Sequence, residues 1–232
     1  MKYRCIIFDC DGTLLDTLED IAAAMNHALN VHGFPVVPPE KYRDMVGWGI
    51  FRLAANALPE DARTEANIQT LGDYATRFME KQPEEQSLTR PYPGIREFLA
   101  ELSGQTAQTK QHARSGRIAT AVLSNKPDSI LRNIITKLFY PFEFDVICGM
   151  RPGIVPKPDP SGVWEILVNM DCSPGDAIFA GDSEIDIETA RNAGCYPLGV
   201  SWGFRSRATL ESAGAARIID KPDEIWELLG RQ

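Results

Sequence analysis

Residues 5–13 read Cys-Ile-Ile-Phe-Asp-Cys-Asp-Gly-Thr, a short apolar run that ends abruptly in acidic residues. A run that is apolar at nearly every position predicts a strand buried on both faces of a sheet. Similar runs follow at residues 118–123, 144–148, 177–180, 196–200 and 217–219. Segments of helical periodicity lie between them, at residues 95–102, 128–138, 160–169, 185–192, 207–212 and 223–229. This alternation predicts an α/β fold, a doubly wound, Rossmann-like parallel sheet with helices on both faces.

Residues 17–81 interrupt the alternation, because they show helical periodicity and contain no strand candidate. Apolar residues recur there at helical spacing, and Thr17 with Asp20 resembles a capping box at the start of the first helix. We interpret residues 17–85 as a small all-helical cap inserted after the first strand, and residues 1–16 and 86–232 as the α/β core. The alternative is a set of extra helices packed on one core.

Residues 103–116 are almost free of apolar side chains, and they are more numerous than the ~4–6 residues usual for such a connection. They join a helix to the start of a strand. We therefore expect a surface loop on the face opposite the carboxyl ends of the strands.

The charge balance of the 232 residues limits the possible partners. There are 24 basic and 32 acidic side chains, a net charge of −8, which argues against nucleic acid or an anionic membrane as the main partner. No apolar stretch approaches the ~18 residues of a membrane span, and the start does not resemble a secretory leader, so a cytoplasmic location is predicted. Either a monomer or a homodimer is compatible with the sequence.

The five cysteines are scattered and form no C-x-x-C pair, so we expect reduced, mostly buried thiols rather than a disulfide framework or a zinc site. Cys10 lies between two aspartates. Strand-like alternation favours a core position for it, and the alternative is a redox-sensitive switch.

Four polar motifs follow candidate strands. They are Asp9-Cys10-Asp11-Gly12-Thr13, Ser124-Asn125-Lys126, Lys157 between two prolines, and Gly181-Asp182-Ser183 with Asp186. Open α/β sheets bind ligands at the carboxyl ends of their strands, so these residues are expected to share one crevice.

That crevice would contain four carboxylates, from Asp9, Asp11, Asp182 and Asp186. Two unit charges ~4 Å apart repel by roughly 4 kcal/mol at an effective dielectric constant near 20, so protons or a cation must intervene. Carboxylate oxygens without a nearby histidine or cysteine suit Mg²⁺. With Lys157 as an anion-binding group, the sequence predicts a site for a metal-bound phosphoryl group.

Together, D-C-D-G-T-L-L-D, S-N-K, the loop lysine and G-D-S-E-I-D resemble the motifs of the haloacid dehalogenase-like hydrolases. Residues 47–49, Gly-Trp-Gly, resemble the phosphoglycolate phosphatase branch of that family. The resemblance implies a magnesium-dependent hydrolase of small phosphorylated metabolites, with 2-phosphoglycolate as the first guess. A pyrophosphatase, a sugar phosphomutase of the same superfamily and a catalytically silent binding or regulatory protein are the alternatives.

The resemblance also implies residue roles. Asp9 would be the nucleophile and Asp11 the general acid and base. Mg²⁺ would be held by Asp9, the Asp11 backbone carbonyl, Asp182 and Asp186, and the phosphoryl group by Ser124, Asn125 and Lys157. Ser124 could merely cap the following helix or do both, and Asp186 could be an exposed acidic residue at a helix start, favoured by the helix dipole.

Two further expectations concern the cap. The phosphomutases of the superfamily carry a histidine at the position of Ile21, which disfavours a mutase. Trp48, Arg43 and Arg52 are candidates for contact with the non-phosphate end of the substrate, and the alternative is that they pack the cap.

Overall fold

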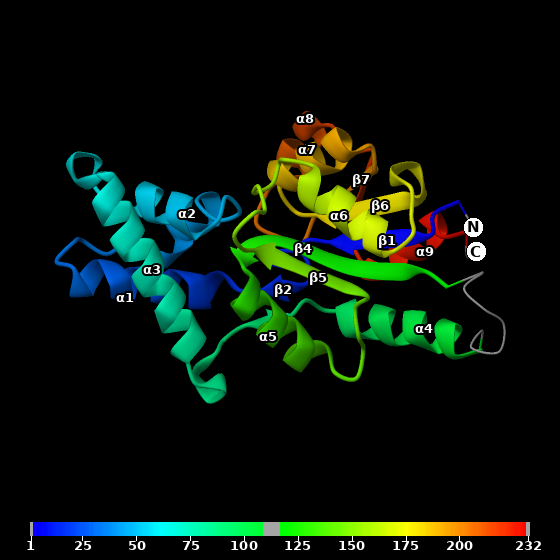
Figure 1. Ribbon diagram of the computed structural model, residues 1–232, viewed down its shortest axis with the longest axis horizontal. Coiled ribbons are helices and arrows are strands. Elements are labelled where there is room, and N and C mark those ends of the chain that lie inside the picture. The colour runs from blue at the N-terminus through cyan, green and yellow to red at the C-terminus, as the bar shows by residue number, and fades with distance from the viewer. Residues whose placement is uncertain (1, 109–116, 231–232) are drawn as a thin grey trace.

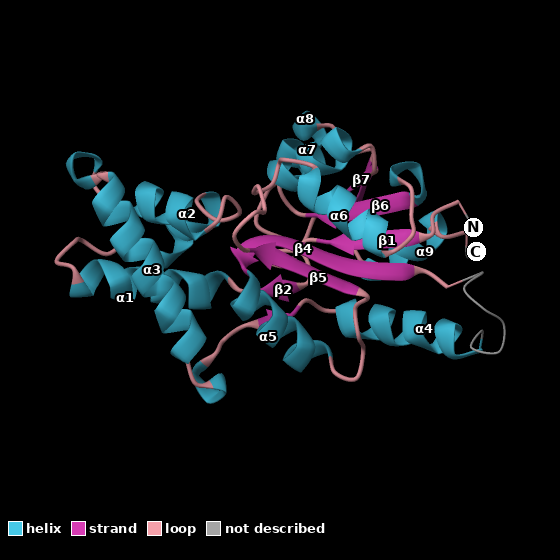
Figure 2. Cartoon of the chain, in the orientation of Figure 1, coloured by secondary structure: helices cyan, strands magenta, loops and turns pink. Residues whose placement is uncertain are grey.

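The structure is a computed structural model that describes residues 2–108 and 117–230. Its centre is a six-stranded, wholly parallel sheet with the order β5-β4-β1-β6-β7-β8 (Figures 1 and 2). The strands are β1 (Cys5–Phe8), β4 (Ala119–Pro127), β5 (Val146–Met150), β6 (Ala177–Gly181), β7 (Tyr196–Val200) and β8 (Arg217–Ile219). The predicted doubly wound fold is confirmed. The chain leaves β1 first toward β5 and later toward β8, so the strand order reverses beside β1, where such sheets bind ligands.

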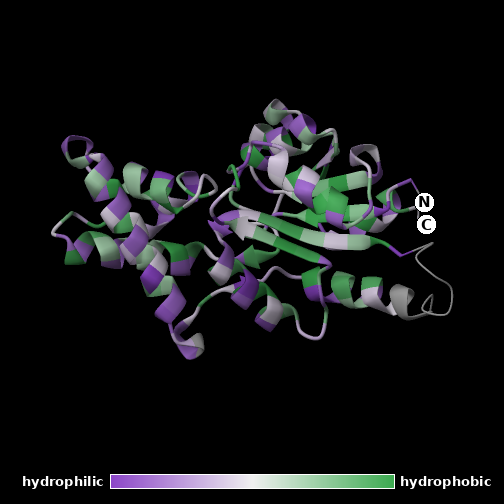
Figure 3. Ribbon diagram, in the orientation of Figure 1, coloured by the Kyte–Doolittle hydropathy of each residue, from purple (hydrophilic) through white to green (hydrophobic). Residues whose placement is uncertain are grey.

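Both faces of the sheet are covered by helices, as the continuously apolar strands predict. Ile6 and Phe8 of β1 pack with α4 (Ile95–Gln108), α5 (Asp128–Phe139) and α9 (Ile225–Leu228). Cys5 and Ile7 point the other way, toward α6 (Ser161–Asn169) and α7 (Glu184–Ala193). A last helix, α8 (Arg207–Ala213), precedes β8. In Figure 3 the strands are accordingly hydrophobic along most of their length.

One expected loop is shorter than predicted. Helix α4 continues to Gln108, so residues 103–108 are helical rather than part of a loop. Apolar periodicity reveals only the part of a helix that packs on the core, and this last part carries polar residues. The rest of the expected loop, residues 109–116, lies outside the described residues.

Residues 17–81 form a separate group of helices with its own buried cluster, which we call the helical unit. It contains α1 (Leu18–Val31), α2 (Ile50–Ala57) and α3 (Glu65–Lys81), with short 3-10 turns at Pro39–Asp44 and Glu60–Ala62. Figure 1 shows it beyond the carboxyl ends of the strands. It therefore covers the edge of the sheet where the four motifs end.

The two chain segments that join the helical unit to the core are bonded to each other. They form a short antiparallel ladder between β2 (Leu15–Asp16) and β3 (Arg90–Pro91), which the sequence analysis missed. The expected capping box is absent, since Thr17 makes no side-chain capping bond to α1. The Asp20 carboxylate instead accepts five hydrogen bonds from the returning segment, donated by Gln82 Nε2, Ser87 Oγ, Leu88 N, Thr89 N and Thr89 Oγ1.

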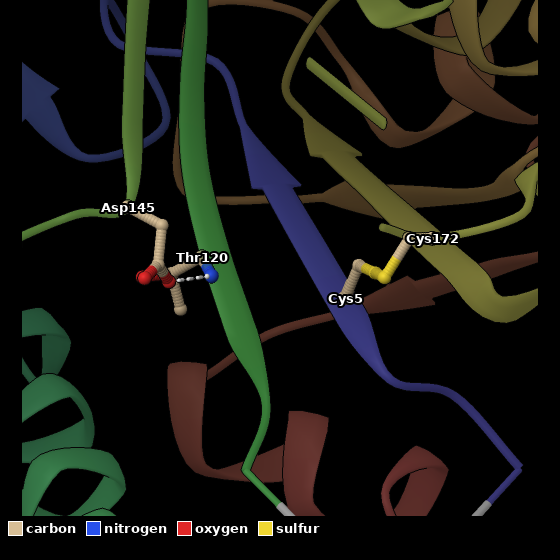
Figure 4. The surroundings of a disulfide bond; sticks show 4 residues. All are labelled: Cys5, Thr120, Asp145 and Cys172. Carbon is tan, nitrogen blue, oxygen red and sulfur yellow. Dashed lines mark hydrogen bonds between the residues drawn. A yellow bond between two sulfur atoms is a disulfide. The ribbon is translucent and has the colours of Figure 1, made fainter. Parts of the chain in front are cut away.

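Cys5 of β1 forms a disulfide with Cys172, which precedes β6 (Figure 4). Thus the expectation that all cysteines are reduced is wrong for this pair, which is 167 residues apart and is brought together only by tertiary packing. Cys10, Cys148 and Cys195 are buried free thiols. Since disulfides are uncommon in a reducing cytoplasm, cysteine usage no longer supports the predicted cytoplasmic location.

Figure 4 also shows Asp145 beside β4, where it accepts a hydrogen bond from the Thr120 amide at 2.8 Å. This bond joins the start of β4 to the segment before β5. Within the described part of the chain, no helix has both the length and the apolar character needed to cross a membrane.

Candidate active site

Asp9 stands directly after β1, and its backbone N–H donates to Ala180 O of the neighbouring strand at 2.9 Å. Lys157 reaches it from the loop after β5. The ammonium of Lys157 lies 2.7 Å from Asp9 Oδ1 and 2.6 Å from Asp186 Oδ1, and the three side chains are at most 8% exposed. A buried lysine therefore joins the first and fourth motifs.

Asp182 completes an acidic triad with Asp9 and Asp186, whose nearest carboxylate oxygens all lie within 4.8 Å of one another. Asp182 accepts hydrogen bonds from Thr13 Oγ1 at 3.0 Å and from the Phe204 N–H at 2.7 Å. Gly181 leaves room for the Asp186 side chain to lie close to the strand end, since a Cβ at position 181 would lie 2.1 Å from the Asp186 Cβ.

The electrostatics of the triad favour a cation. Burial raises the pKa of Asp9 well above its usual value, although Lys157 opposes the shift. Burial, together with the Asp186 charge, raises the pKa of Asp182 to about 7. Burial alone would lower the pKa of Lys157, but Asp186 and Asp9 raise it. One lysine thus leaves the triad short of positive charge, and its donors, all carboxylate oxygens, are those that suit Mg²⁺.

Asp186 has two roles at once. Its Oδ2 accepts from Ser183 N and Ser183 Oγ at the start of α7, while Oδ1 contacts Lys157. Asp186 thus lies at the start of α7, but it is only 1% exposed, so the alternative of an exposed acidic residue at a helix start is wrong.

The second motif occupies the irregular end of β4 rather than a loop after it. Ser124 does not cap α5, whose N-cap is Pro127, and Ser124 Oγ accepts from the Lys126 amide at 3.2 Å. The Asn125 side chain bonds to both backbone groups of Lys157, at 2.8 and 3.2 Å. Asn125 also donates to Gly47 O of the helical unit at 3.0 Å. The contacts of the Asn125 amide thus position the Lys157 backbone.

Lys126 is a site residue to which the sequence analysis gave no role. Its ammonium lies 2.8 Å from Asp11 Oδ1 and 3.1 Å from Asp11 Oδ2, and its side chain is 5% exposed. Burial alone would lower the pKa of Lys126, but the Asp11 charge raises it. The sequence signal that could have identified Lys126 was its position two residues after Ser124, at a strand end that reaches the crevice.

The helical unit forms one wall of a pocket at the first and second motifs. A cavity of about 50 Å³ is lined on the core side by Asp9, Asp11, Ser124, Asn125, Lys126 and Pro127. The helical unit supplies the other wall, which consists of Ile21, Val46, Gly47, Gly49, Ile50, Leu53 and Met79. We call this cavity the chamber. It is small and partly apolar, and the two aspartates of the first motif open into it.

The three candidates for substrate specificity do not line the chamber. Trp48 and Arg52 line a different groove of about 460 Å³ at the outer seam between the helical unit and the core. Arg43 donates to Gly203 O at 2.9 Å. Their predicted contact with substrate has no support from this arrangement.

Cys10 lies in the main core cluster and is fully buried. Burial and the Asp11 charge raise the pKa of its thiol well above the usual value, which disfavours the reactive thiolate. This agrees with the core interpretation of Cys10 rather than with a redox switch.

Known proteins resemble the chain over almost its full length. The family model for the haloacid dehalogenase-like hydrolases matches residues 6–200. A phosphoglycolate phosphatase of Vibrio cholerae serotype O1 is 29% identical over 229 residues, which cover 97% of this chain and 96% of that protein. An N-acetylmuramic acid 6-phosphate phosphatase of Pseudomonas aeruginosa is 29% identical over 232 residues, covering 100% and 96%. A crystal structure from Lactobacillus delbrueckii subsp. bulgaricus superposes with a TM-score of 0.84 at 28% identity and covers 99% of each chain.

Proposed function

Because the chain belongs to the haloacid dehalogenase-like hydrolases, we propose that it is a magnesium-dependent phosphatase of small phosphate monoesters. The supporting observation is that Asp9 and Asp11 both line the chamber between core and helical unit, with Lys157 bonded to Asp9 and an acidic triad beside it. The phosphoglycolate phosphatase among its relatives makes 2-phosphoglycolate the first substrate to test.

Asp9, Asp182, Asp186 and the backbone carbonyl of Asp11 would hold Mg²⁺, as the burial of the three carboxylates and the raised pKa values of Asp9 and Asp182 suggest. When bound, the ion would offset the negative charge of the phosphoryl oxygens during transfer.

The reaction proposed for the chain's own residues has two steps. In the first, an Asp9 oxygen attacks phosphorus, the ester P–O bond breaks, and Asp11 gives its proton to the leaving alkoxide oxygen, which departs as the alcohol. In the second, Asp11 takes a proton from water, which attacks the phosphoaspartate and releases phosphate. Ser124 and Lys157 would bind the phosphoryl oxygens, and Lys126, which contacts both Asp11 oxygens, would orient that carboxylate.

We further propose that the helical unit is the cap that excludes bulk water during these steps. Its apolar wall over the chamber supports this role. Ile21 is part of that wall, so the position has no group that transfers protons, which favours hydrolysis over phosphomutase chemistry.

Phosphate release from p-nitrophenyl phosphate, 2-phosphoglycolate and pyrophosphate, with Mg²⁺ or with EDTA, tests the function. We expect turnover of at least one ester with Mg²⁺, no turnover with EDTA, and no turnover by Asp9→Asn. Asp16→Asn removes the same charge at an exposed position and is expected to retain activity. Full activity in EDTA would contradict the metal, and an active Asp9→Asn would contradict the nucleophile. A pyrophosphate-only activity would select the pyrophosphatase alternative.

A further inference from the structure

The segment between β7 and α8, residues 201–206, touches the triad on one side. We call it the bridging loop. The Phe204 N–H donates to Asp182 Oδ2 at 2.7 Å. A Cβ added at Gly203 would lie 2.2 Å from the Asp182 Cβ and 2.4 Å from Gly12 O. The backbone of this loop therefore packs directly on Asp182.

The same residues contact the helical unit on their other side. Phe204 is 7% exposed and belongs to the buried cluster of the helical unit, where, among the described residues, it alone comes from the α/β core. Arg205 donates to three carbonyls of the helical unit: Val46 O at 2.9 Å, Asp44 O at 3.4 Å, and Arg43 O. In return, Arg43 donates to Gly203 O at 2.9 Å. The core and the helical unit thus donate hydrogen bonds to each other's backbone carbonyls.

Arg205 is held in this position from the core. Its Nε lies 3.1 Å from Glu184 Oε2, and the Arg205 side chain is only 9% exposed. Glu184 is the first residue of α7, two residues after Asp182. Arg205 therefore connects the start of α7 to the helical unit.

From these contacts we propose that the bridging loop is a latch that couples the seating of the helical unit to the position of Asp182, with Arg205 as a positioning residue. The inference rests on the proposed function in one respect, the role of Asp182 in holding Mg²⁺. When the helical unit moves away, Phe204 and Arg205 lose their contacts with it, and the Phe204 N–H is no longer fixed on Asp182. Contact of the helical unit with the core then favours metal binding. Metal binding favours that contact to the same degree, because the coupling free energy between two linked equilibria is reciprocal.

Arg205→Ala tests the latch, and Arg207→Ala is its matched control. Arg207 lies two residues further along, pairs with Asp220, and has a 44% exposed side chain. In metal-free protein, we expect Arg205→Ala to increase hydrogen exchange at the Phe204 amide. In calorimetric titration, we expect its Mg²⁺ affinity to fall about tenfold, the lower end of the loss when a ligand's support is removed. Arg207→Ala is expected to match the wild type in both measurements.

The outcomes separate this inference from the proposed function. Wild-type protein that binds no Mg²⁺ overturns the function and the coupling with it. Wild-type protein that binds Mg²⁺, with unchanged affinity and unchanged Phe204 exchange in Arg205→Ala, overturns the latch alone. If Arg205→Ala does not fold, Arg205→Lys replaces it. A lysine keeps the charge but cannot bond Glu184 and three carbonyls together, so an intermediate loss of affinity is expected.

Discussion

Replacing Gly12 by alanine tests whether the turn after the nucleophile must be glycine to keep the metal triad in place. Gly12 has a φ of +91° and faces Asp182. Alanine in this left-handed region costs about 1–2 kcal/mol. That part of the penalty concerns the backbone alone and would apply to any glycine of similar φ.

A second penalty is specific to this position. The new Cβ would lie 2.3 Å from Asp182 Oδ2 and 2.6 Å from its Cγ and Oδ1, whereas ordinary contact begins at 3.4 Å. The carboxylate must therefore retreat by 3.4 − 2.3 = 1.1 Å. Overpacking of this kind costs about 1–3 kcal/mol, so the free energy of unfolding should fall by about 2–5 kcal/mol in total. Misplacement by ~1 Å costs on the order of 100-fold in rate.

Two other glycines separate the penalties. Gly33 has a φ of +77° and Gly153 a φ of +89°, and a Cβ at either would meet no atom of the described residues within 4 Å. Urea unfolding should show a loss of about 1–2 kcal/mol for Gly33→Ala and for Gly153→Ala, with phosphatase activity retained. Gly12→Ala should lose more stability and about 99% of kcat/KM. Full activity in Gly12→Ala, with no more destabilisation than in the controls, would refute this account of the turn.

Four further predictions concern buried charges and the disulfide. Lys157→Met should lower the free energy of unfolding in EDTA by about 3–5 kcal/mol, because it leaves buried carboxylates without a cation, and an unchanged urea midpoint would contradict this. Burial raises the pKa of Asp182 from 3.8 to about 7, so the folded protein holds a proton that the unfolded chain has released between these values. The melting temperature in EDTA should therefore fall as pH rises from about 4 to about 7, and calorimetry that shows a rise instead would count against the buried triad. Asp20→Asn should destabilise the protein by about 2–4 kcal/mol, because either orientation of the new amide places its NH₂ group against the backbone N–H of Leu88 or of Thr89. The exposed Glu19→Gln should have no effect in the same urea titration. Cys172→Ser should lose up to about 5 kcal/mol in oxidising buffer, where the disulfide closes a 167-residue separation, and nothing in reducing buffer; equal stability of the two proteins when oxidised would exclude the bond.

The strands of the sheet could be predicted because each carries successive apolar residues, and the central strands β1 and β6 are buried at every position. Every one of the six apolar runs overlaps a strand of the sheet. The ladder of β2 and β3 could not be predicted, since two residues in each strand are too few to show a period. Asp20 has the spacing of a capping box residue, but its partners are more than 60 positions away. The local sequence pattern therefore predicted the wrong hydrogen-bond partner for Asp20.

The candidate site divides in the same way. The acidic motifs and Lys157 could be predicted to converge because parallel strands end at one edge of a sheet. Lys126 could have been included on the same argument. Phe204 could not, because its contribution to Asp182 is a backbone N–H, which every residue except proline possesses. Cys172 likewise has no local signal, since its partner depends on how the loop before β6 packs against β1.

Among the polar contacts that join the helical unit to the core, those of Asp20 and those of Arg205 differ in strength, which bears on where we expect the helical unit to open. Asp20 is 8% exposed and concentrates five hydrogen bonds on one carboxylate, so separating it from its donors would leave a charge buried without partners. The bonds of Arg205 to the helical unit go to neutral carbonyls, two of them in exposed contacts that water can replace. We therefore expect movement of the helical unit to pivot near Asp20 and to begin at the bridging loop. Because Phe204 belongs to that loop, the proposed latch predicts that opening the chamber also loosens Asp182.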